Sequence, residues 1–342
     1  MQKEIINSTN LLDKDGNLCV KGYAKKNIIK YNKENLKTSK LLLKEWDYYY
    51  IGNDNYGLAL TIADNGYMGL LSISFLDFKN KKEITKSDMI LFPLGKTRHP
   101  TSSSFGDLSM QTKNGYAMFK NDGKSRTIFG NFNNFDEDKK IEFNIELSEE
   151  PSESITMVTP FTKEKRFYYN QKINCLKAQG FFAIGNKKYL FDKKDSLAVL
   201  DWGRGVWTYK NTWYWGSLSC YINNKTFGFN IGYGFGDTSS ATENVIFYDG
   251  KAHKINDIDF GIPNKDKEDK FLEQWKITSS DKRLELTFKP LFVRHAFTNA
   301  FVICSLQNQV FGYFSGKAIL DDKTEIEFEN KLGFAEKVFN KW

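Results

Sequence analysis

The chain has 342 residues and a formal net charge of +7 at pH 7, and 15% of its residues are aromatic. This length exceeds what one hydrophobic core usually organises, so we expect two domains. The sequence holds no run of about 18 apolar residues and starts without a signal-peptide pattern, which predicts a cytoplasmic protein without stable membrane insertion. Its cations are mostly lysines interleaved with asparagine and glutamate, as on a solvated surface, so we expect no nucleic-acid partner.

The first half of the chain is a series of short apolar runs with two-residue alternation, the pattern of β-strands. Residues 46–52, 56–65 and 66–78 predict three strands of a meander joined by polar turns. The Asn121-Asp122-Gly123 segment between two alternating runs is a strong hairpin signal. Another turn is expected at Gly185-Asn186.

The second half continues in the same way after Trp213. Only two short helices are expected in the whole chain, near residues 32–44 and within residues 332–342. The glycine-rich segment 232–236 follows a strand but opens no helix of apolar period. It therefore predicts a polar loop between strands and not a nucleotide-binding turn.

Many short strands without crossover helices indicate antiparallel sheets. Each half of the chain has the size of a small closed barrel, which can hold one ligand. We therefore expect an all-β fold of two tandem antiparallel β-barrel domains, residues 1–207 and residues 208–342. A single long twisted sandwich is the alternative.

Familiar catalytic motifs are missing from the sequence. His99, His253 and His295 lack the spacing of metal ligands, and the four cysteines lie far apart without a C-x-x-C pair. A G-x-S-x-G elbow, a P-loop and a dinucleotide fingerprint are also absent. We therefore expect reduced thiols, no metal site and no cofactor.

The stretch LAVLDWGRGVWTYKNTWYWG, residues 197–216, places Asp201 and Arg204 among four of the seven tryptophans. A carboxyl group desolvated among indoles has a raised pKa and can serve as a general acid. Pairing with Arg204 would have the opposite effect, and a structural Asp201–Arg204 pair is the alternative. Gly203 and Gly205 predict a sharp bend where the chain passes from one sheet to the next.

Asp201 is thus the candidate catalytic residue. The candidate ligand-binding residues are Trp202, Arg204, Trp207, Trp213, Trp215, Asn230, Glu243, Asn244 and His295. The indoles would form the walls of an apolar cavity, and Arg204 would orient a polar head group of the ligand or tune Asp201.

Five segments of the sequence resemble the bacterial family called domain of unknown function 2804. They are LLDKDGNLCVKGYAK, WDYYYIG with LALTIADNGYMG, DWGRGVWTYKNTWYWG, TENVIFYDG, and QVFGYFSGKAILDD with LGFAEKVFNKW. The resemblance covers almost the whole chain. It departs from the family at GYAKKNI, where a Gly-Trp-x-Arg element and a nearby proline are expected.

More distantly, residues 168–205 and the following WYW are similar in layout to the carotenoid 1,2-hydratase (hydroxyneurosporene synthase) group. That resemblance implies two lipocalin-like barrels and acid–base chemistry without a cofactor. It places Asp201 at the position of the acidic residue of the group. Trp202 stands where the group has a histidine, so the acid carries over without its histidine partner.

Together these observations predict a protein that binds a hydrophobic small molecule in an aromatic-lined cavity and acts on it as a hydratase, isomerase or cyclase. A small-molecule or lipid carrier of the same fold is one alternative. A carbohydrate-binding or glycoside-acting protein is another, in which Asp201 and Glu243 would be the pair of carboxyl groups.

Overall fold

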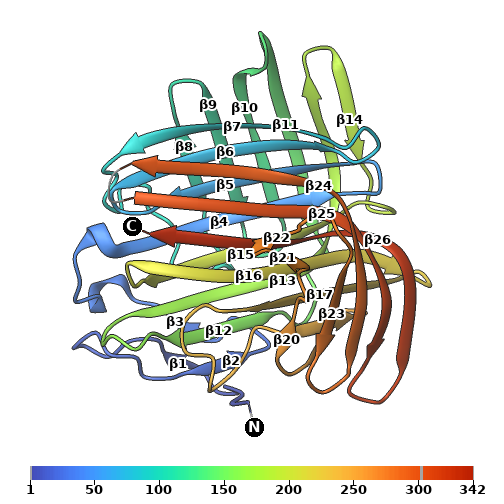
Figure 1. Ribbon diagram of the computed structural model, residues 1–342. Helices are drawn as coiled ribbons and strands as arrows, with labels where there is room; N and C mark the ends of the chain where they lie inside the picture. Colours follow the sequence, from blue (N-terminus) through green and yellow to red (C-terminus); the bar gives the residue numbers. More distant parts are fainter. Residues whose placement is uncertain (1, 301–302, 342) are drawn as a thin grey trace.

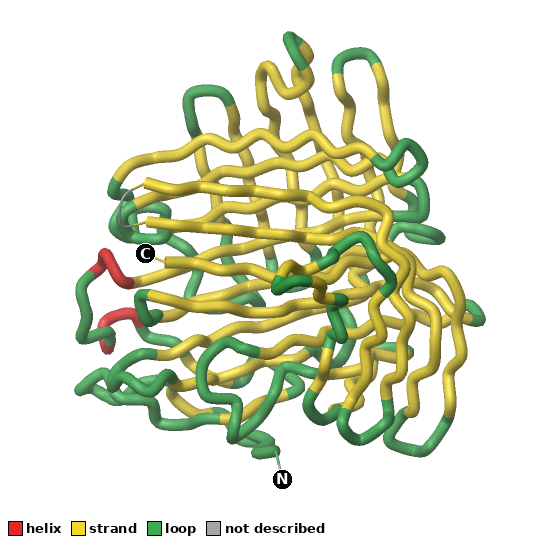
Figure 2. Tube along the Cα trace, in the orientation of Figure 1, coloured by secondary structure: helices red, strands yellow, loops and turns green. Residues whose placement is uncertain are grey.

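A computed structural model describes residues 2–300 and 303–341 of the chain (Figure 1). Within those residues the fold is built from strands, and the helical structure consists of two 3-10 turns, η1 (Lys33–Asn35) and η2 (Lys40–Leu42) (Figure 2). The all-β prediction is therefore confirmed. None of the described helices is long and apolar enough to cross a membrane.

The first sheet has thirteen strands among the described residues. In order across the sheet its main path is β7 (Lys82–Leu91), β6 (Met68–Asp77), β5 (Tyr56–Asp64), β4 (Leu43–Gly52), β15 (Leu197–Val206), β13 (Phe167–Ile184), β11 (Lys139–Ser148), β10 (Arg126–Asp136), β9 (Gly115–Asn121) and β8 (Leu108–Gln111). Outside this path, β12 (Ile155–Pro160) and β14 (Lys187–Phe191) pair with β13, and β2 (Gly22–Ala24) pairs with β12. The meander and the hairpin at Asn121 lie where the sequence predicted them.

The second sheet has nine strands in the described part of the chain. Their order is β19 (Lys251–Lys254), β18 (Val245–Tyr248), β17 (Lys225–Tyr233), β16 (Lys210–Ile222), β26 (Glu325–Lys341), β25 (Ile303–Ile319), β24 (Leu284–Ala300), β23 (Trp275–Ser279) and β20 (Ile258–Asp259). Two small pairs complete the fold, namely β1 (Thr9–Asn10) with β3 (Ile29–Lys30), and β21 (Asn264–Lys265) with β22 (Glu268–Asp269). The chain passes from the first sheet to the second between Val206 and Lys210. The division into domains at residue 207 stays a prediction.

Both predicted helices are corrected by the structure. The segment 32–44 forms the two 3-10 turns, because the side chains of Asn32 and Ser39 each accept a backbone hydrogen bond that caps a single turn. The segment 332–342 belongs to β26 as far as residue 341. Strand β26 pairs with β16 on one side and β25 on the other, and these two ladders override the local helical pattern.

The expected bend at Gly203 and Gly205 is also wrong, because both glycines lie inside the extended strand β15. Their lack of a side chain serves packing. A Cβ atom at Gly203 would lie 2.0 Å from the Trp46 ring, and one at Gly205 would lie 2.8 Å from Nε1 of Trp207. Glycine thus lets two indoles approach the strand closely.

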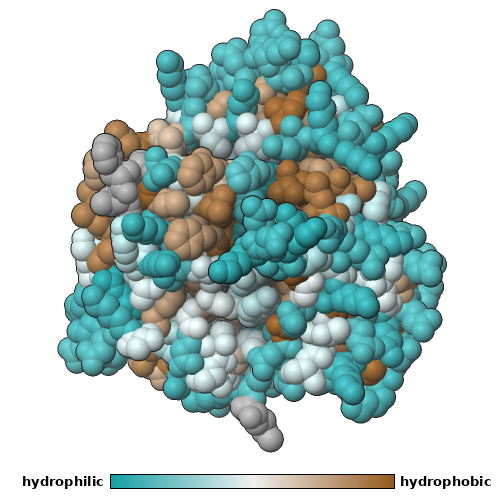
Figure 3. Space-filling view, in the orientation of Figure 1, coloured by the Kyte–Doolittle hydropathy of each residue, from teal (hydrophilic) through white to brown (hydrophobic). Residues whose placement is uncertain are grey.

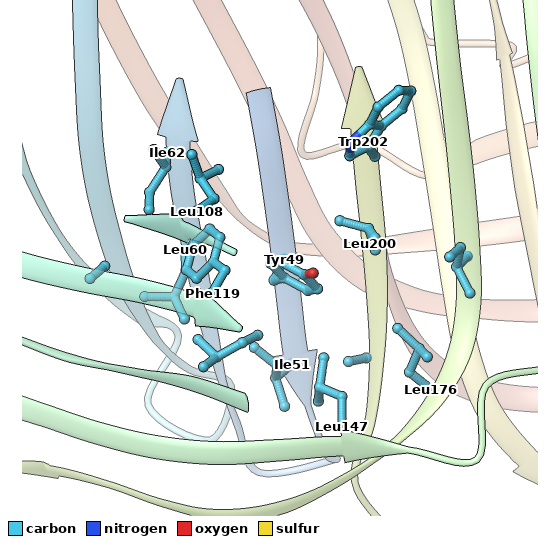
Figure 4. Packing of buried hydrophobic residues seen from close by; sticks show 14 of the residues in the cluster. Tyr49, Ile51, Leu60, Ile62, Leu108, Phe119, Leu147, Leu176, Leu200 and Trp202 are labelled. Atoms are coloured by element: carbon cyan, nitrogen blue, oxygen red, sulfur yellow. The ribbon is translucent and has the colours of Figure 1, made fainter. Parts of the chain in front are cut away.

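Each sheet curls into a half-barrel around its own core. Figure 4 shows the core of the first sheet, where Tyr49, Leu200 and Trp202 pack with aliphatic side chains from several strands. A separate buried cluster joins the sheets, with Tyr48 and Val199 from the first against Trp215, Phe311 and others from the second. Figure 3 shows one face of the molecule, mainly hydrophilic, with apolar side chains gathered over β24 and β25. Side chains fill the core of the first half-barrel. The polar residues of the candidate site lie between the two sheets.

Candidate functional site

Strand alternation divides the aromatic stretch between two environments. Trp202 and Arg204 point from β15 into the core of the first sheet, where the Arg204 guanidinium lies 4.1 Å from the centroid of the Trp202 ring. Tyr169 packs edge-on against Trp202, with 5.2 Å between the ring centroids. Asp201 points the opposite way, because side chains alternate across a strand. The sequence stretch therefore does not form one site.

Arg204 is part of the core of the first sheet. It is completely buried, and it donates hydrogen bonds to Asp47 at 2.8 Å and to the carbonyl oxygens of Trp46 and Pro100. Burial raises the pKa of Asp47, and the guanidinium of Arg204 opposes that rise. Asp201 and Arg204 therefore have separate partners and do not form the pair considered from the sequence.

Asp201 faces the second sheet and pairs with a lysine that the sequence analysis did not select. Lys172 on β13 places its Nζ 2.7 Å from Oδ2 of Asp201, and both side chains are nearly buried. The same Nζ lies 4.2 Å from the ring centroid of Trp215 on the second sheet. The ammonium group is thus held between a carboxylate and the face of an indole.

Two cross-strand rows bring polar and aromatic side chains together. On the first sheet the row is Lys172, Asp201 and Tyr48. On the second sheet it is Gly232, Trp215, Glu336, Gln309 and Arg294. The rows touch where Nε2 of Gln309 donates to the Tyr48 hydroxyl at 3.5 Å, and where the Tyr48 and Trp215 rings meet edge to face. The register of both sheets therefore positions one site. We call Lys172, Asp201, Glu243 and Glu336 the intersheet cluster.

Glu336 is held by two hydrogen bonds. Its Oε1 accepts from Nε1 of Trp213 at 3.1 Å, and its Oε2 accepts from Nε2 of Gln309 at 3.2 Å. Burial raises the pKa of Glu336 to about 7, although the hydrogen bond from Trp213 and the charge of Lys172 oppose the rise. This group can exchange a proton near neutral pH.

Glu243 reaches the cluster from the loop before β18. Its carboxyl group lies over Gly232, where a Cβ atom would come within 2.3 Å of Oε1. Its Oε2 is buried and accepts no hydrogen bond from the described residues. Burial raises the pKa of Glu243, and Lys172 lowers it in part. A buried carboxyl oxygen that lacks a partner is suited to hold a proton and donate it.

A cavity of about 20 Å³ adjoins this carboxyl group. It is lined by Met157, Thr159, Tyr168, Asn170, Gly232, Tyr233, Phe235, Thr238 and Glu243. Asn170 is completely buried, and neither its Oδ1 nor its Nδ2 has a hydrogen-bond partner in the part of the chain that the structure describes. A cavity of this size and polarity has room for about one water molecule.

The structure brings some of the other predicted residues to this region. Trp207 and Trp213 pack against each other beside the cluster, with 5.9 Å between ring centroids. Asn230 accepts a hydrogen bond from Nε1 of Trp215 at 2.7 Å and donates to the carbonyl of Glu243 at 3.1 Å. These side chains support the cluster and its loop.

Asn244 and His295 have other surroundings. Asn244 is buried and bonds backbone groups, accepting from the Gly232 amide and donating to the carbonyl of Asn256. His295 is exposed on β24, where its Nδ1 lies 2.8 Å from Oδ1 of Asn308. The described His, Cys, Asp and Glu side chains form no group of three that could hold a metal ion.

Sequence reasoning missed Tyr168, Asn170, Lys172 and Glu336. The first three occupy alternate positions of β13 and point toward the second sheet. The run of three polar residues, Asn170, Gln171 and Lys172, inside a strand is the signal that could have found them. Glu336 carried no comparable signal, because its position depends on the pairing of β26 with β16.

These features define a lipocalin-like β protein of two half-barrels with a buried, charged cluster between its sheets. The chain belongs to the family described as domain of unknown function (DUF2804), whose model matches residues 2–342. No curated protein matches the sequence.

Two solved structures resemble the fold over most of the chain. A putative AttH from Nitrosomonas europaea has 10% sequence identity and a TM-score of 0.51, covering 86% of this chain and 92% of that chain. Kievitone hydratase from Nectria haematococca has 11% identity and a TM-score of 0.47, covering 87% of this chain and 88% of that chain. At these identities the likeness concerns the fold alone.

Proposed function

We propose that the protein is an acid–base enzyme that adds water to a carbon–carbon double bond of a hydrophobic small molecule, or removes water to form one. The observation that carries the proposal is the position of Glu243. Its buried, unpartnered Oε2 belongs to a carboxyl group with a raised pKa that lines a cavity of about 20 Å³, with the unpartnered Asn170 amide in the same cavity among the described residues.

The charges of the intersheet cluster favour a protonated Glu243. One ammonium, Lys172, is surrounded by three carboxyl groups, and it pairs directly with Asp201. The cluster is electrically neutral when Asp201 alone is ionised and Glu243 and Glu336 carry protons. A buried site disfavours any further charge, so Glu243 is expected to hold its proton at neutral pH, where Glu336, with a pKa of about 7, is partly ionised.

In the addition, Glu243 donates its proton to one carbon of the double bond. The electron pair of that bond forms the new C–H bond, and positive charge develops on the neighbouring carbon. The ring of Tyr168, which lines the same cavity as Glu243, stabilises that charge. A water held by Asn170 forms the C–O bond and gives its proton to the Glu243 carboxylate, which restores the acid. Elimination of water follows the same steps in reverse.

The test uses a lipophilic metabolite extract incubated with the protein in water labelled with heavy oxygen, followed by mass spectrometry. The expected result is a compound that gains one water and carries the label, or one that loses one water and carries none. Glu243→Gln should slow this conversion at least 100-fold, as expected for loss of a general acid. Glu268→Gln, which alters a side chain that is 75% exposed, is the matched control and should leave the rate unchanged.

Two results would contradict the proposal. One is an equal rate in Glu243→Gln and the native protein. The other is labelling confined to a glycan fraction run in parallel, which would favour the glycoside-acting alternative. Unconverted binding of a lipophilic compound would favour the carrier.

A further inference from the structure

The loop between β17 and β18 carries one large apolar side chain in an otherwise small and polar segment. Residues 234–240 read Gly-Phe-Gly-Asp-Thr-Ser-Ser, and Phe235 is their single aromatic residue. Gly234 and Gly236 on either side have φ angles of +91° and +74°, which side chains rarely adopt. The backbone is thus shaped to turn Phe235 inward from an exposed loop.

Phe235 lies among four aromatic rings, which we call the aromatic box. Its ring centroid is 4.6 Å from that of Trp207, 4.8 Å from Tyr168, 5.2 Å from Phe161 and 5.4 Å from Trp213. All four contacts are edge to face. Tyr168 comes from the first sheet and Trp213 from the second, so the box spans the junction between the sheets.

The aromatic box adjoins the intersheet cluster. Phe235, Tyr168 and Glu243 line the same small cavity. On another side of the box, Nε1 of Trp213 donates to Oε1 of Glu336 at 3.1 Å. A ring placed where Phe235 now lies would therefore line the same cavity as the Glu243 carboxyl group.

The loop is held to the first sheet by few polar contacts. The amide of Asp237 donates to the carbonyl of Pro160 at 2.7 Å, and the amide of Lys3 donates to the carbonyl of Ser240 at 2.7 Å. Within the loop, the Ser239 amide donates to the Asp237 carboxylate. Gly234, Gly236, Asp237 and Ser239 are exposed. Packing of Phe235 is thus the main apolar contribution that holds the loop down.

We propose that the aromatic box is the binding site for a flat apolar group of the ligand, an aromatic ring or a conjugated polyene, and that Phe235 is a plug which this group displaces. The inference rests on the proposed function and names its substrate class. It also accounts for the size of the cavity. The space beside Glu243 suits one water, and outward movement of Phe235 would join to it the volume of a phenyl ring.

The test is binding of N-phenylnaphthylamine, a flat neutral probe whose fluorescence rises in apolar surroundings. Removing the plug should expose the box, so Phe235→Ala should bind the probe at least tenfold more tightly than the native protein. Phe235→Leu should give an intermediate affinity. Phe105→Ala is the matched control, because Phe105 is 67% exposed on another loop, and it should leave the affinity unchanged.

Adding Phe161→Ala to Phe235→Ala removes one wall of the box and should lower the gained affinity severalfold. Unchanged or weaker probe binding by a Phe235→Ala protein with a native circular dichroism spectrum would overturn the proposal that Phe235 acts as a plug. This outcome is separate from the chemistry, because probe binding involves no proton transfer. A Glu243→Gln variant that converts substrate normally would overturn the proposed function and leave the binding result standing.

Discussion

Lys172 and Asp201 form an ion pair across adjacent strands, with 2.7 Å between Nζ and Oδ2 and side chains that are 4% and 10% exposed. The pair lies at the junction of the two sheets, where Trp215 covers the ammonium. It supplies the only positive charge of the intersheet cluster. Its ammonium lowers the pKa of both Glu243 and Glu336, together with Lys254 for Glu243 and Arg294 for Glu336.

Replacing Lys172 by methionine should destabilise the protein by about 3–5 kcal/mol, because it leaves Asp201 buried without its cation. Lys172→Met with Asp201→Asn should recover part of that loss, and urea unfolding of the four proteins of the cycle measures the coupling. Lys177→Met on the same strand is the control. It removes an exposed pair with Glu149 and should cost less than about 1 kcal/mol. An equal loss of unfolding free energy in Lys172→Met and Lys177→Met would contradict the structural role assigned to the buried Lys172 pair.

Arg204→Met should also cost about 3–5 kcal/mol in free energy of unfolding, because Asp47 would lose its ion-pair partner in the core and Glu45 would keep only Lys33. Its effect should be confined to stability. At a temperature where the variant is folded, probe binding and conversion should match those of the native protein. A loss of substrate conversion without a loss of stability would show that Arg204 takes part in the functional site.

The strand content and many turns could be predicted from the sequence, because two-residue alternation and the Asn121-Asp122-Gly123 turn act locally. The segments 32–44 and 332–342 could not. In segment 32–44 the side chains of Asn32 and Ser39 cap single 3-10 turns in place of one longer helix. In segment 332–342 the pairing of β26 with β16 and β25 produces a strand in place of a helix. The expected bend at Gly203 failed for a related reason, since a glycine in an extended strand and one in a turn look alike in sequence.

Glu336→Gln should change how stability depends on pH. The pKa of Glu336 is raised by folding to about 7, so its contribution to stability is fully present below the unfolded pKa near 4.5 and is lost as the pH rises through 7. Glutamine carries no charge at any pH. The stability of the native protein relative to the variant should therefore fall by about 3 kcal/mol between pH 4.5 and pH 8, at 1.4 kcal/mol per pH unit. Urea unfolding of both proteins across this pH range measures the difference in stability. Parallel pH profiles of the two proteins would contradict the prediction.

Gly232→Ala should displace Glu243, since the new Cβ would lie 2.3 Å from Oε1 and 2.7 Å from the Tyr214 carbonyl oxygen. We expect a loss of about 1–3 kcal/mol in stability together with a loss of conversion. Gly216→Ala is the matched control, because the new Cβ would come no closer than 3.1 Å to another atom, on the Ile231 side chain. A Gly232→Ala protein with native activity would show that Glu243 needs no such placement.

The site was harder to predict than the fold. Asp201 was found from its aromatic neighbours, and the structure places it at the intersheet cluster. Its partner Lys172 lies on another strand, and only the register of β13 with β15 brings the two together. Trp202 and Arg204 looked equivalent to Asp201 in sequence, but alternation sends them into the opposite core. Which face of a strand meets a second sheet is a tertiary property.

The central claim is that Glu243 holds a proton at neutral pH, and infrared spectroscopy tests it without a substrate. Protonated and ionised carboxyl groups absorb at different frequencies. The difference spectrum between the native protein and Glu243→Gln at pH 7 should show loss of a protonated-carboxyl band, and Glu336→Gln identifies the separate band of Glu336. Loss of a carboxylate band in Glu243→Gln, with every protonated-carboxyl band retained, would contradict the account.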